Sequence, residues 1–403
     1  MLIHWIWYSQ LPRVPLRVKA DLLRIFHDPE DIYFAEEEAL WTVEGMTEAL
    51  IKALFNRDLA NSREILRVCG EKNISILTYS DGCYPHRLKH IPDPPMVLYY
   101  KGYLPDWDSV PVIGIVGTRK ASAYGMQVSD KMGFQIADCG GLVVSGGADG
   151  IDSMALRGAM KARKKVVAVL GCGADVVYPA KNKELFREIE RQGCLITEFS
   201  PGTPPHSWNF PQRNRIISGI SSGVLVVEAP ERSGALNTAQ HALDQGRDVF
   251  VVPGNIDSPC AAGSNELMRD RAIPVFSGWD VVGEYERLYP DAVSRGSKDR
   301  GKQLLVAETV VYPDISVEKL PKDDKKSIDN MEKSNYSVKE NALPGLTEEE
   351  QMVLKRLTET PRLVDDVIVE TGLPTGKVLS ILTMLALKGA VQNHPGKLIS
   401  RKS

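Results

Sequence analysis

The apolar residues of this chain follow two different spacings. Up to about residue 70, segments such as LRVKADLLRIF and MTEALIKALF place apolar residues every three to four positions, which predicts short amphipathic helices. From about residue 74, short apolar runs such as VPVIGIVG and SGVLVVEAP alternate with Gly-rich turns and helical segments. Continuous apolar strands that alternate with helices are typical of a parallel sheet covered on both faces. The pattern therefore predicts an α/β fold with a doubly wound, Rossmann-like parallel sheet.

The same pattern divides the chain into four parts. We expect a small helical domain over residues 1–70 and the Rossmann-like domain over residues 71–290. Residues 291–345, with runs such as SRGSKDRGK, are polar, charged and poor in aromatic residues, which predicts a flexible linker. Over residues 346–403 the chain returns to amphipathic helices, followed by the strand-like run KLISR. That order predicts a small winged-helix-like domain.

Composition and charge narrow the functional classes. The 403 residues carry a formal net charge of −3, so a site for a polyanion must be a local cluster of Lys and Arg. The six cysteines are scattered without a C-x-x-C pair, which predicts buried free thiols and no metal site. Because the sequence contains no run of about 18 apolar residues, we expect a cytoplasmic protein without a membrane partner.

The most informative run is FPQRNRIIS, in which two arginines flank an asparagine. Arg213, Asn214 and Arg215 follow a proline and precede an apolar stretch, so we expect them where a loop becomes a regular element. Fixed cations and an amide, without proton-transfer groups, favour binding of phosphate over bond cleavage. Trp208 and Phe210 precede the arginines, and they either stack on the bases of a single strand or pack this loop onto the sheet.

Two Gly-rich turns follow predicted strands, and glycine at such turns lets backbone N–H groups approach a phosphate. The turns are GTRKAS and SGGADGID. Their candidate phosphate-binding residues are Gly117, Arg119, Ser122, Ser145, Gly146 and Gly147. The G-x-x-G spacing of the first turn argues against a dinucleotide, and so does the end of the second strand, which is Ser145-Gly146-Gly147 and not an acidic residue. We therefore expect no cofactor.

Lys181 follows the corner formed by Tyr178 and Pro179, after the next predicted strand. The carboxyl ends of parallel strands meet at one edge of a sheet, and open α/β sheets bind ligands at that edge. We therefore expect Lys181 to contact phosphate together with Arg119, and not to be an ordinary solvated charge.

Three acidic residues near this edge have alternative roles. Asp149 and Asp152 could ligate magnesium, but we favour capping of the following helix. Glu228 could be catalytic, but we favour a structural role at the strand edge or an ion pair with Arg213 or Arg215.

Taken in order, the motifs GTRKAS, SGGADGID, LGCGADVVYP, FPQRNRIISG, VVEAPERSGALNTAQHA and VPGN resemble those of the DNA-processing protein A family, also called DprA or Smf. The likeness covers about residues 75–280. The N-terminal helices are similar to the sterile-alpha-motif-like domain of many members, and the C-terminal segment looks like their winged helix. That segment carries only Lys377 and Lys388 on its last helices, so contact with protein and contact with DNA both stay open.

The resemblance implies a non-catalytic, single-stranded DNA-binding protein of natural transformation, competence and DNA recombination. It implies displacement of single-strand-binding protein, loading of the RecA recombinase and a homodimer. It also implies that the phosphate pocket contains Arg119, the turn from Ser145 to Gly147, Lys181, and the run from Arg213 to Arg215.

The alternative is an enzyme on a related fold. Lysine-decarboxylase-like phosphoribohydrolases cleave nucleoside monophosphates and carry a PGGxGTxxE signature. The corresponding stretch here, PERSGALNTAQHA, lacks the double glycine, and Gln240 lies near the expected position of the catalytic Glu. Without that carboxylate the chemistry loses its charge-stabilising or proton-handling group, so we expect no enzymatic activity.

Overall fold

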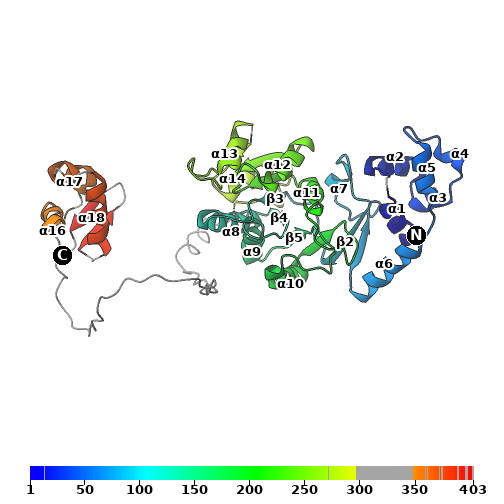
Figure 1. Ribbon diagram of the computed structural model, residues 1–403, viewed down its shortest axis with the longest axis horizontal. Coiled ribbons are helices and arrows are strands. Elements are labelled where there is room, and N and C mark those ends of the chain that lie inside the picture. Colours follow the sequence, from blue (N-terminus) through cyan, green and yellow to red (C-terminus); the bar gives the residue numbers. More distant parts are fainter. Residues whose placement is uncertain are drawn as a thin grey trace, which may run out of the picture. The chain divides into compact units, whose positions relative to one another are not determined.

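The computed structural model describes residues 1–12, 14–270, 272–295, 348–358, 360, 362–371, 373, 375–387, 390–394 and 398–401. The chain divides into two compact units, Met1–Val311 and Tyr312–Ser403 (Figure 1). Most of the linker expected over residues 291–345 lies outside the described residues.

The chain begins with a series of helices, as the apolar spacing predicts. They are α1 (Leu2–Gln10), α2 (Leu16–Phe26), α3 (Pro29–Phe34), α4 (Glu37–Leu40), α5 (Glu48–Leu54) and α6 (Ala60–Glu71). Trp5, Leu22 and Leu54 are buried between them, in a hydrophobic cluster that also contains Val97 and Tyr99 of the sheet. The N-terminal helices and the sheet therefore share a core within one unit.

The sheet has the order β1-β2-β6-β5-β4-β3-β7-β8-β9. The strands are β1 (Ser75–Thr78), β2 (Val97–Gly102), β3 (Val112–Val116), β4 (Leu142–Ser145), β5 (Val166–Val169), β6 (Cys194–Thr197), β7 (Gly223–Val226), β8 (Asp248–Val251) and β9 (Ile273–Pro274). Strands β3 to β9 pair in parallel, whereas β1 and β2 pair with their neighbours in antiparallel fashion. The doubly wound parallel sheet is confirmed, with an antiparallel edge.

Helices cover both faces of this sheet because alternate strand residues point to opposite sides (Figure 1). Ile113 and Ile115 belong to the cluster with α8 (Ala123–Asp138), α9 (Ile151–Lys161), α10 (Lys183–Gln192) and α14 (Gly278–Val282). Val112 and Val116 belong to the cluster with α7 (His86–Lys89), α11 (Asn209–Ile220), α12 (Gly234–Asp244) and α13 (Ala262–Arg269).

The second unit contains three helices and a small sheet among its described residues. The helices are α16 (Glu348–Lys355), α17 (Val364–Thr371) and α18 (Thr375–Leu387). The sheet has the order β10-β12-β11, with β10 (Arg362–Leu363), β12 (Leu398–Arg401) and β11 (Val391–His394). The expected strand at KLISR is β12, and helices followed by an antiparallel hairpin form the expected winged-helix arrangement. Lys388 lies outside the described residues.

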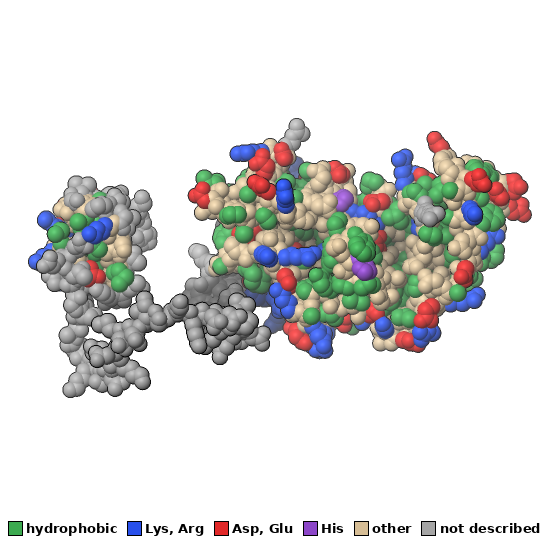
Figure 2. All heavy atoms as spheres, viewed as in Figure 1, with side chains coloured by type: hydrophobic (Ala, Val, Ile, Leu, Met, Phe, Trp, Pro, Cys, Tyr) green, Lys and Arg blue, Asp and Glu red, His purple; other side chains and the backbone are tan. Residues whose placement is uncertain are grey.

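None of the described helices is long and apolar enough to cross a membrane. On the face of the first unit in Figure 2, basic and acidic side chains are interspersed, with acidic side chains gathered around α4. A site for a polyanion on this unit therefore depends on local geometry, as the net charge predicts.

Candidate functional site

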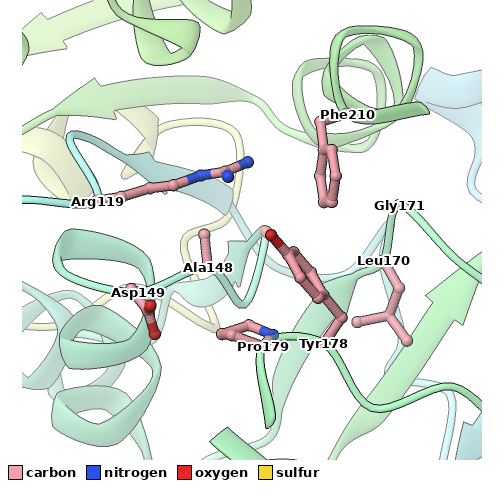
Figure 3. Close-up of a pocket in the computed structure, with 9 residues that line it drawn as sticks. Arg119, Ala148, Asp149, Leu170, Gly171, Tyr178, Pro179 and Phe210 are labelled. Carbon is pink, nitrogen blue, oxygen red and sulfur yellow. The ribbon is translucent and has the colours of Figure 1, made fainter. Parts of the chain in front are cut away.

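A hollow of about 330 Å³, counted with the open space at its mouth, lies at the carboxyl edge of β3, β4 and β5 (Figure 3). The residues that line it follow the ends of these three strands, except for one at the start of α11. They are Arg119, Gly146, Ala148, Asp149, Leu170, Gly171, Tyr178, Pro179 and Phe210. The strand ends thus converge at the sheet edge where the sequence places the candidate residues.

Arg119 is an exposed cation at this hollow. Its guanidinium carbon lies 4.8 Å from the centre of the Phe210 ring, and Figure 3 shows the side chain reaching across the hollow toward that ring. Among the residues that the structure describes, no carboxylate forms an ion pair with Arg119. Its charge and its N–H donors therefore face the hollow and are available to an anion.

Two aromatic rings form the opposite wall. The Tyr178 and Phe210 ring centres are 5.5 Å apart, and the planes are tilted by 43°. A Cβ atom at Gly171 would lie 2.8 Å from the Phe210 ring, so glycine there makes room for Phe210. Phe210 is therefore packed into the wall, as one of the two alternatives for this residue proposes.

Trp208 differs from Phe210. Its side chain is 62% exposed, and its ring stacks on His206 with centres 4.4 Å apart and planes 11° apart. One face of the indole is covered by the imidazole, while most of the side chain remains accessible. Trp208 is thus placed to offer a stacking surface two residues before Phe210.

The run from Phe210 to Ser218 lies inside α11, so the expectation of a loop at the arginines is wrong. Pro211 is in the first helical turn, where its missing N–H removes no intrahelical hydrogen bond. The proline therefore marks the start of a helix and not a turn before one. Arg213, Asn214 and Arg215 are all buried within this helix.

Arg213 holds two strand ends together. Its Nη1 donates to the carbonyl oxygens of Gly146, at 2.7 Å, and Val169. A Cβ atom at Gly146 would lie 2.5 Å from the guanidinium nitrogens, so Gly146 is required by this contact. Burial lowers the pKa of Arg213 to about 10, although the nearby Asp152 carboxylate favours the charged form. Arg213 thus lies behind the wall of the hollow.

Arg215 forms ion pairs with two carboxylates. Its Nε lies 2.8 Å from Asp93 Oδ2, and its Nη2 lies 2.6 Å from Glu198 Oε2. Burial raises the pKa of Glu198, and the Arg215 charge opposes this rise. Neither carboxylate lines the hollow. Asn214 is also engaged, since its Nδ2 donates to the carbonyl oxygen of Gly234. The expectation that the side chains of Arg215 and Asn214 reach the hollow is therefore wrong.

The turn after β4 binds a carboxylate of its own chain. Asp152 Oδ2 accepts hydrogen bonds from the N–H groups of Gly146, at 3.1 Å, and Ala148, at 3.4 Å. Gly147 has φ of 65°, a conformation that favours glycine. The Ser145 hydroxyl donates to the Ile115 carbonyl at 2.6 Å. The Gly146 N–H and the Ser145 hydroxyl, which we expected to donate to a phosphate, thus donate to acceptors within the protein.

The acidic residues of this turn are not helix caps. The N-cap of α9 is Gly150, and Asp152 lies inside the first turn. Asp149 instead forms an ion pair with Lys181, with Oδ2 and Nζ 3.0 Å apart. Lys181 is exposed, so this pair lies at the rim of the hollow. No group of three or more His, Cys, Asp or Glu side chains in the described part of the chain could hold a metal ion.

The turn after β3 is fixed by Glu228. Its carboxylate accepts from the Ser122 hydroxyl at 2.6 Å and from the Ser122 N–H at 3.0 Å. Ser122 also caps α8 by accepting from the Gly125 N–H. Of the two structural roles expected for Glu228, the role at the strand edge is therefore confirmed, and the ion pair with Arg213 or Arg215 is wrong. Ser122 is already engaged.

Gly117 has a packing role. A Cβ atom there would lie 2.5 Å from the Ile151 side chain, so glycine lets α9 approach β3. Sequence reasoning missed Ala148, Leu170 and Gly171 as lining residues. Their only signal is that each lies within three residues of the end of a strand, and this position does not distinguish lining residues from others.

Comparison with known proteins shows that this chain is similar to the members of one family. Residues 75–286 match the family described as DNA recombination-mediator protein A, and residues 337–397 match the DprA winged helix domain. The protein Smf of Synechocystis sp. is 32% identical over 99% of this chain and 98% of its own length. The DNA processing protein DprA of Bacillus subtilis is 41% identical over 55% of this chain and 74% of its own length.

A solved structure is also similar. The X-ray structure of DNA processing protein A from Streptococcus pneumoniae aligns with a TM-score of 0.62 and 31% sequence identity. The alignment covers 70% of this chain and 98% of that chain.

Proposed function

The chain belongs to the DNA recombination-mediator protein A (DprA) family, and on that premise we propose that it binds single-stranded DNA at the hollow described above. The observation that carries the proposal is Arg119, an exposed arginine without an ion-pair partner among the described residues. It lies at the sheet edge, beside two aromatic rings. Membership of this family supports a role in DNA processing.

A single strand fits this site better than a duplex. Trp208, two residues before Phe210, exposes an aromatic surface, and base faces are accessible for stacking only where bases are unpaired. Lys181 extends the positive rim, although Asp149 neutralises part of its charge. We assign phosphate contact to Arg119 and Lys181, base stacking to Trp208, and a supporting role to Arg213 and Phe210.

The wider role is proposed from the family alone. We propose a cytoplasmic homodimer that displaces single-strand-binding protein and loads the RecA recombinase in transformation and recombination. We also propose the boundaries of the helical domain, residues 1–70, and of the Rossmann-like domain, residues 71–290.

We propose no catalytic step. The carboxylate of Glu228 is held by Ser122, and Gln240 donates to Asp244 on the exposed side of α12. Incubation with AMP, followed by chromatography for adenine and ribose phosphate, tests this directly. Release of either product would favour the phosphoribohydrolase alternative.

The binding proposal is tested by fluorescence anisotropy with labelled single-stranded and double-stranded oligonucleotides. We expect tighter binding of oligo-dT than of duplex, and an affinity that falls with salt by about 0.7 log unit per log unit of salt for each phosphate contact. Arg119→Ala should weaken binding about tenfold and reduce the slope by about one contact.

The matched control is Arg187→Ala, which removes an exposed arginine from α10, where it pairs with Glu184. This variant has the same net charge as Arg119→Ala and should bind like the wild type. Equal affinity of wild type and Arg119→Ala would contradict the site, and absence of binding by the wild type would contradict the function.

A further inference from the structure

The loop that forms the aromatic wall of the hollow also contacts the N-terminal helices. Gly171 and Tyr178 of this loop line the hollow. Between them, Ala174 is 5% exposed and belongs to the hydrophobic cluster built around Trp5 and Leu22. The wall loop, residues 170–179, is therefore held between the binding site and the helices.

An ion pair reinforces this contact. Lys72, the C-cap residue of α6, lies with its Nζ 2.5 Å from Asp175 Oδ2. The other carboxylate oxygen, Oδ1, accepts from the Gly202 N–H at 2.8 Å. The Asp175 side chain is only 8% exposed, whereas that of Lys72 is 47% exposed. One buried carboxylate thus joins α6, the wall loop and the segment that precedes Trp208.

The two loops are also tied to each other beside the hollow. The Gly173 N–H donates to the Thr203 carbonyl at 2.9 Å, and the Asn209 side chain donates to the Gly171 carbonyl at 3.0 Å. A displacement of Asp175 would therefore be passed to the wall loop and to the first turn of α11, which carries Phe210. Packed loops with such internal bonds shift together.

We propose that Asp175 is a positioning residue for single-stranded DNA, and that the N-terminal helices set the affinity of the hollow through the Lys72–Asp175 ion pair. This inference rests on the proposed binding function. Lys72 lies on the helical side and does not line the hollow, so it acts on the strand only through the wall loop.

The test is a double-mutant cycle measured by oligo-dT anisotropy on the full chain. Lys72→Met and Asp175→Asn should each weaken binding about three- to tenfold, which lies within the range of coupling carried by packed networks. The double variant should be no weaker than Asp175→Asn, because both changes break one connection. Lys72→Arg, which keeps the cation, should restore most of the affinity.

The matched control is Arg67→Met on the same helix. Arg67 pairs with Glu64 and Glu71 on an exposed surface, so its loss removes one charge without touching the wall loop. Circular dichroism at the assay temperature distinguishes loss of positioning from loss of folding. Lys72→Met tests the proposal even where Asp175→Asn fails to fold.

Two failures can be told apart. If the wild type does not bind oligo-dT, the proposed function is wrong. If the wild type binds and Lys72→Met binds equally well, or weakens binding no more than Arg67→Met does, the positioning role is wrong. Additive losses in the double variant would also overturn it.

Discussion

The rim of the hollow and the interior of α11 both carry arginines, but the two regions use them differently. At the rim, Arg119 is exposed and has no carboxylate partner among the described residues. Inside α11, Arg213 donates to strand carbonyls and Arg215 pairs with two carboxylates. The comparison shows that an arginine-rich motif can contain structural cations, while Arg119, which we propose binds DNA, lies in a turn much earlier in the chain.

Desolvation explains the difference. A buried guanidinium loses its hydration, and it is tolerated only where carbonyls or carboxylates replace the water. Once carbonyls or carboxylates have replaced the water, the N–H donors of that guanidinium are no longer available to a ligand. An exposed arginine keeps its hydration and can exchange it for phosphate.

The largest difference between the rim of the hollow and the interior of α11 is expected in the free energy of unfolding. Arg215→Met should lower the free energy of unfolding by about 3–5 kcal/mol, because it leaves the largely buried Glu198 carboxylate without its ion-pair partner. Urea denaturation measures this change. Arg187→Met, at an exposed ion pair, should change stability by no more than about 1 kcal/mol. Equal effects of the two variants would contradict a structural role for Arg215.

The surroundings of Arg215 should also respond to pH, through Lys19 of α2. Lys19 lies near Glu198, and burial lowers its pKa from 10.5 to about 8. Between these values the unfolded chain keeps a proton that the folded protein has released, so this residue makes the folded protein more stable as pH rises. The full window corresponds to about 3 kcal/mol.

Comparison with Lys19→Met isolates this contribution from those of other titrating groups. The stability of the wild type relative to this variant should increase from pH 8 toward 10.5, as measured by denaturation at both ends. A difference that stays constant across this window would show that Lys19 titrates normally.

At the rim, a smaller effect is expected on binding. Trp208→Ala should weaken oligo-dT binding by about 1–3 kcal/mol, the usual contribution of one stacked base. Its melting temperature should stay that of the wild type, because the side chain is 62% exposed. Phe210→Ala should instead lower the melting temperature, since the ring packs against Tyr178. Unchanged binding by Trp208→Ala would show that Trp208 does not stack on a base of the bound strand.

The sheet and the location of the site could be predicted from sequence because both depend on local signals. Short runs of valine and isoleucine mark the strands, and residues after strand ends necessarily meet at one edge. On that basis the sequence places Arg119 and Lys181 at this edge: Arg119 lines the hollow, and Lys181 pairs with Asp149, which also lines it. Phosphate contact by either residue stays a prediction.

The roles of the other arginines could not be predicted because their partners are distant in sequence. Asp93 lies 122 positions from Arg215, and the carbonyl of Gly146 lies 67 positions from Arg213. Nothing within FPQRNRIIS indicates these partners, and Pro211 is compatible with a turn as well as with a first helical turn. Similarly, only the folded turn shows that Asp152 occupies the amide donors.

Arginine footprinting with phenylglyoxal and mass spectrometry, with and without oligo-dT, distinguishes the exposed Arg119 from the buried arginines of α11. We predict that Arg119 is modified in the free protein and protected by the oligonucleotide, while Arg213 and Arg215 stay unmodified in both samples. Modification of Arg213 or Arg215 in the free protein with protection by DNA, or an Arg119 that oligo-dT does not protect, would contradict the proposed binding role of Arg119.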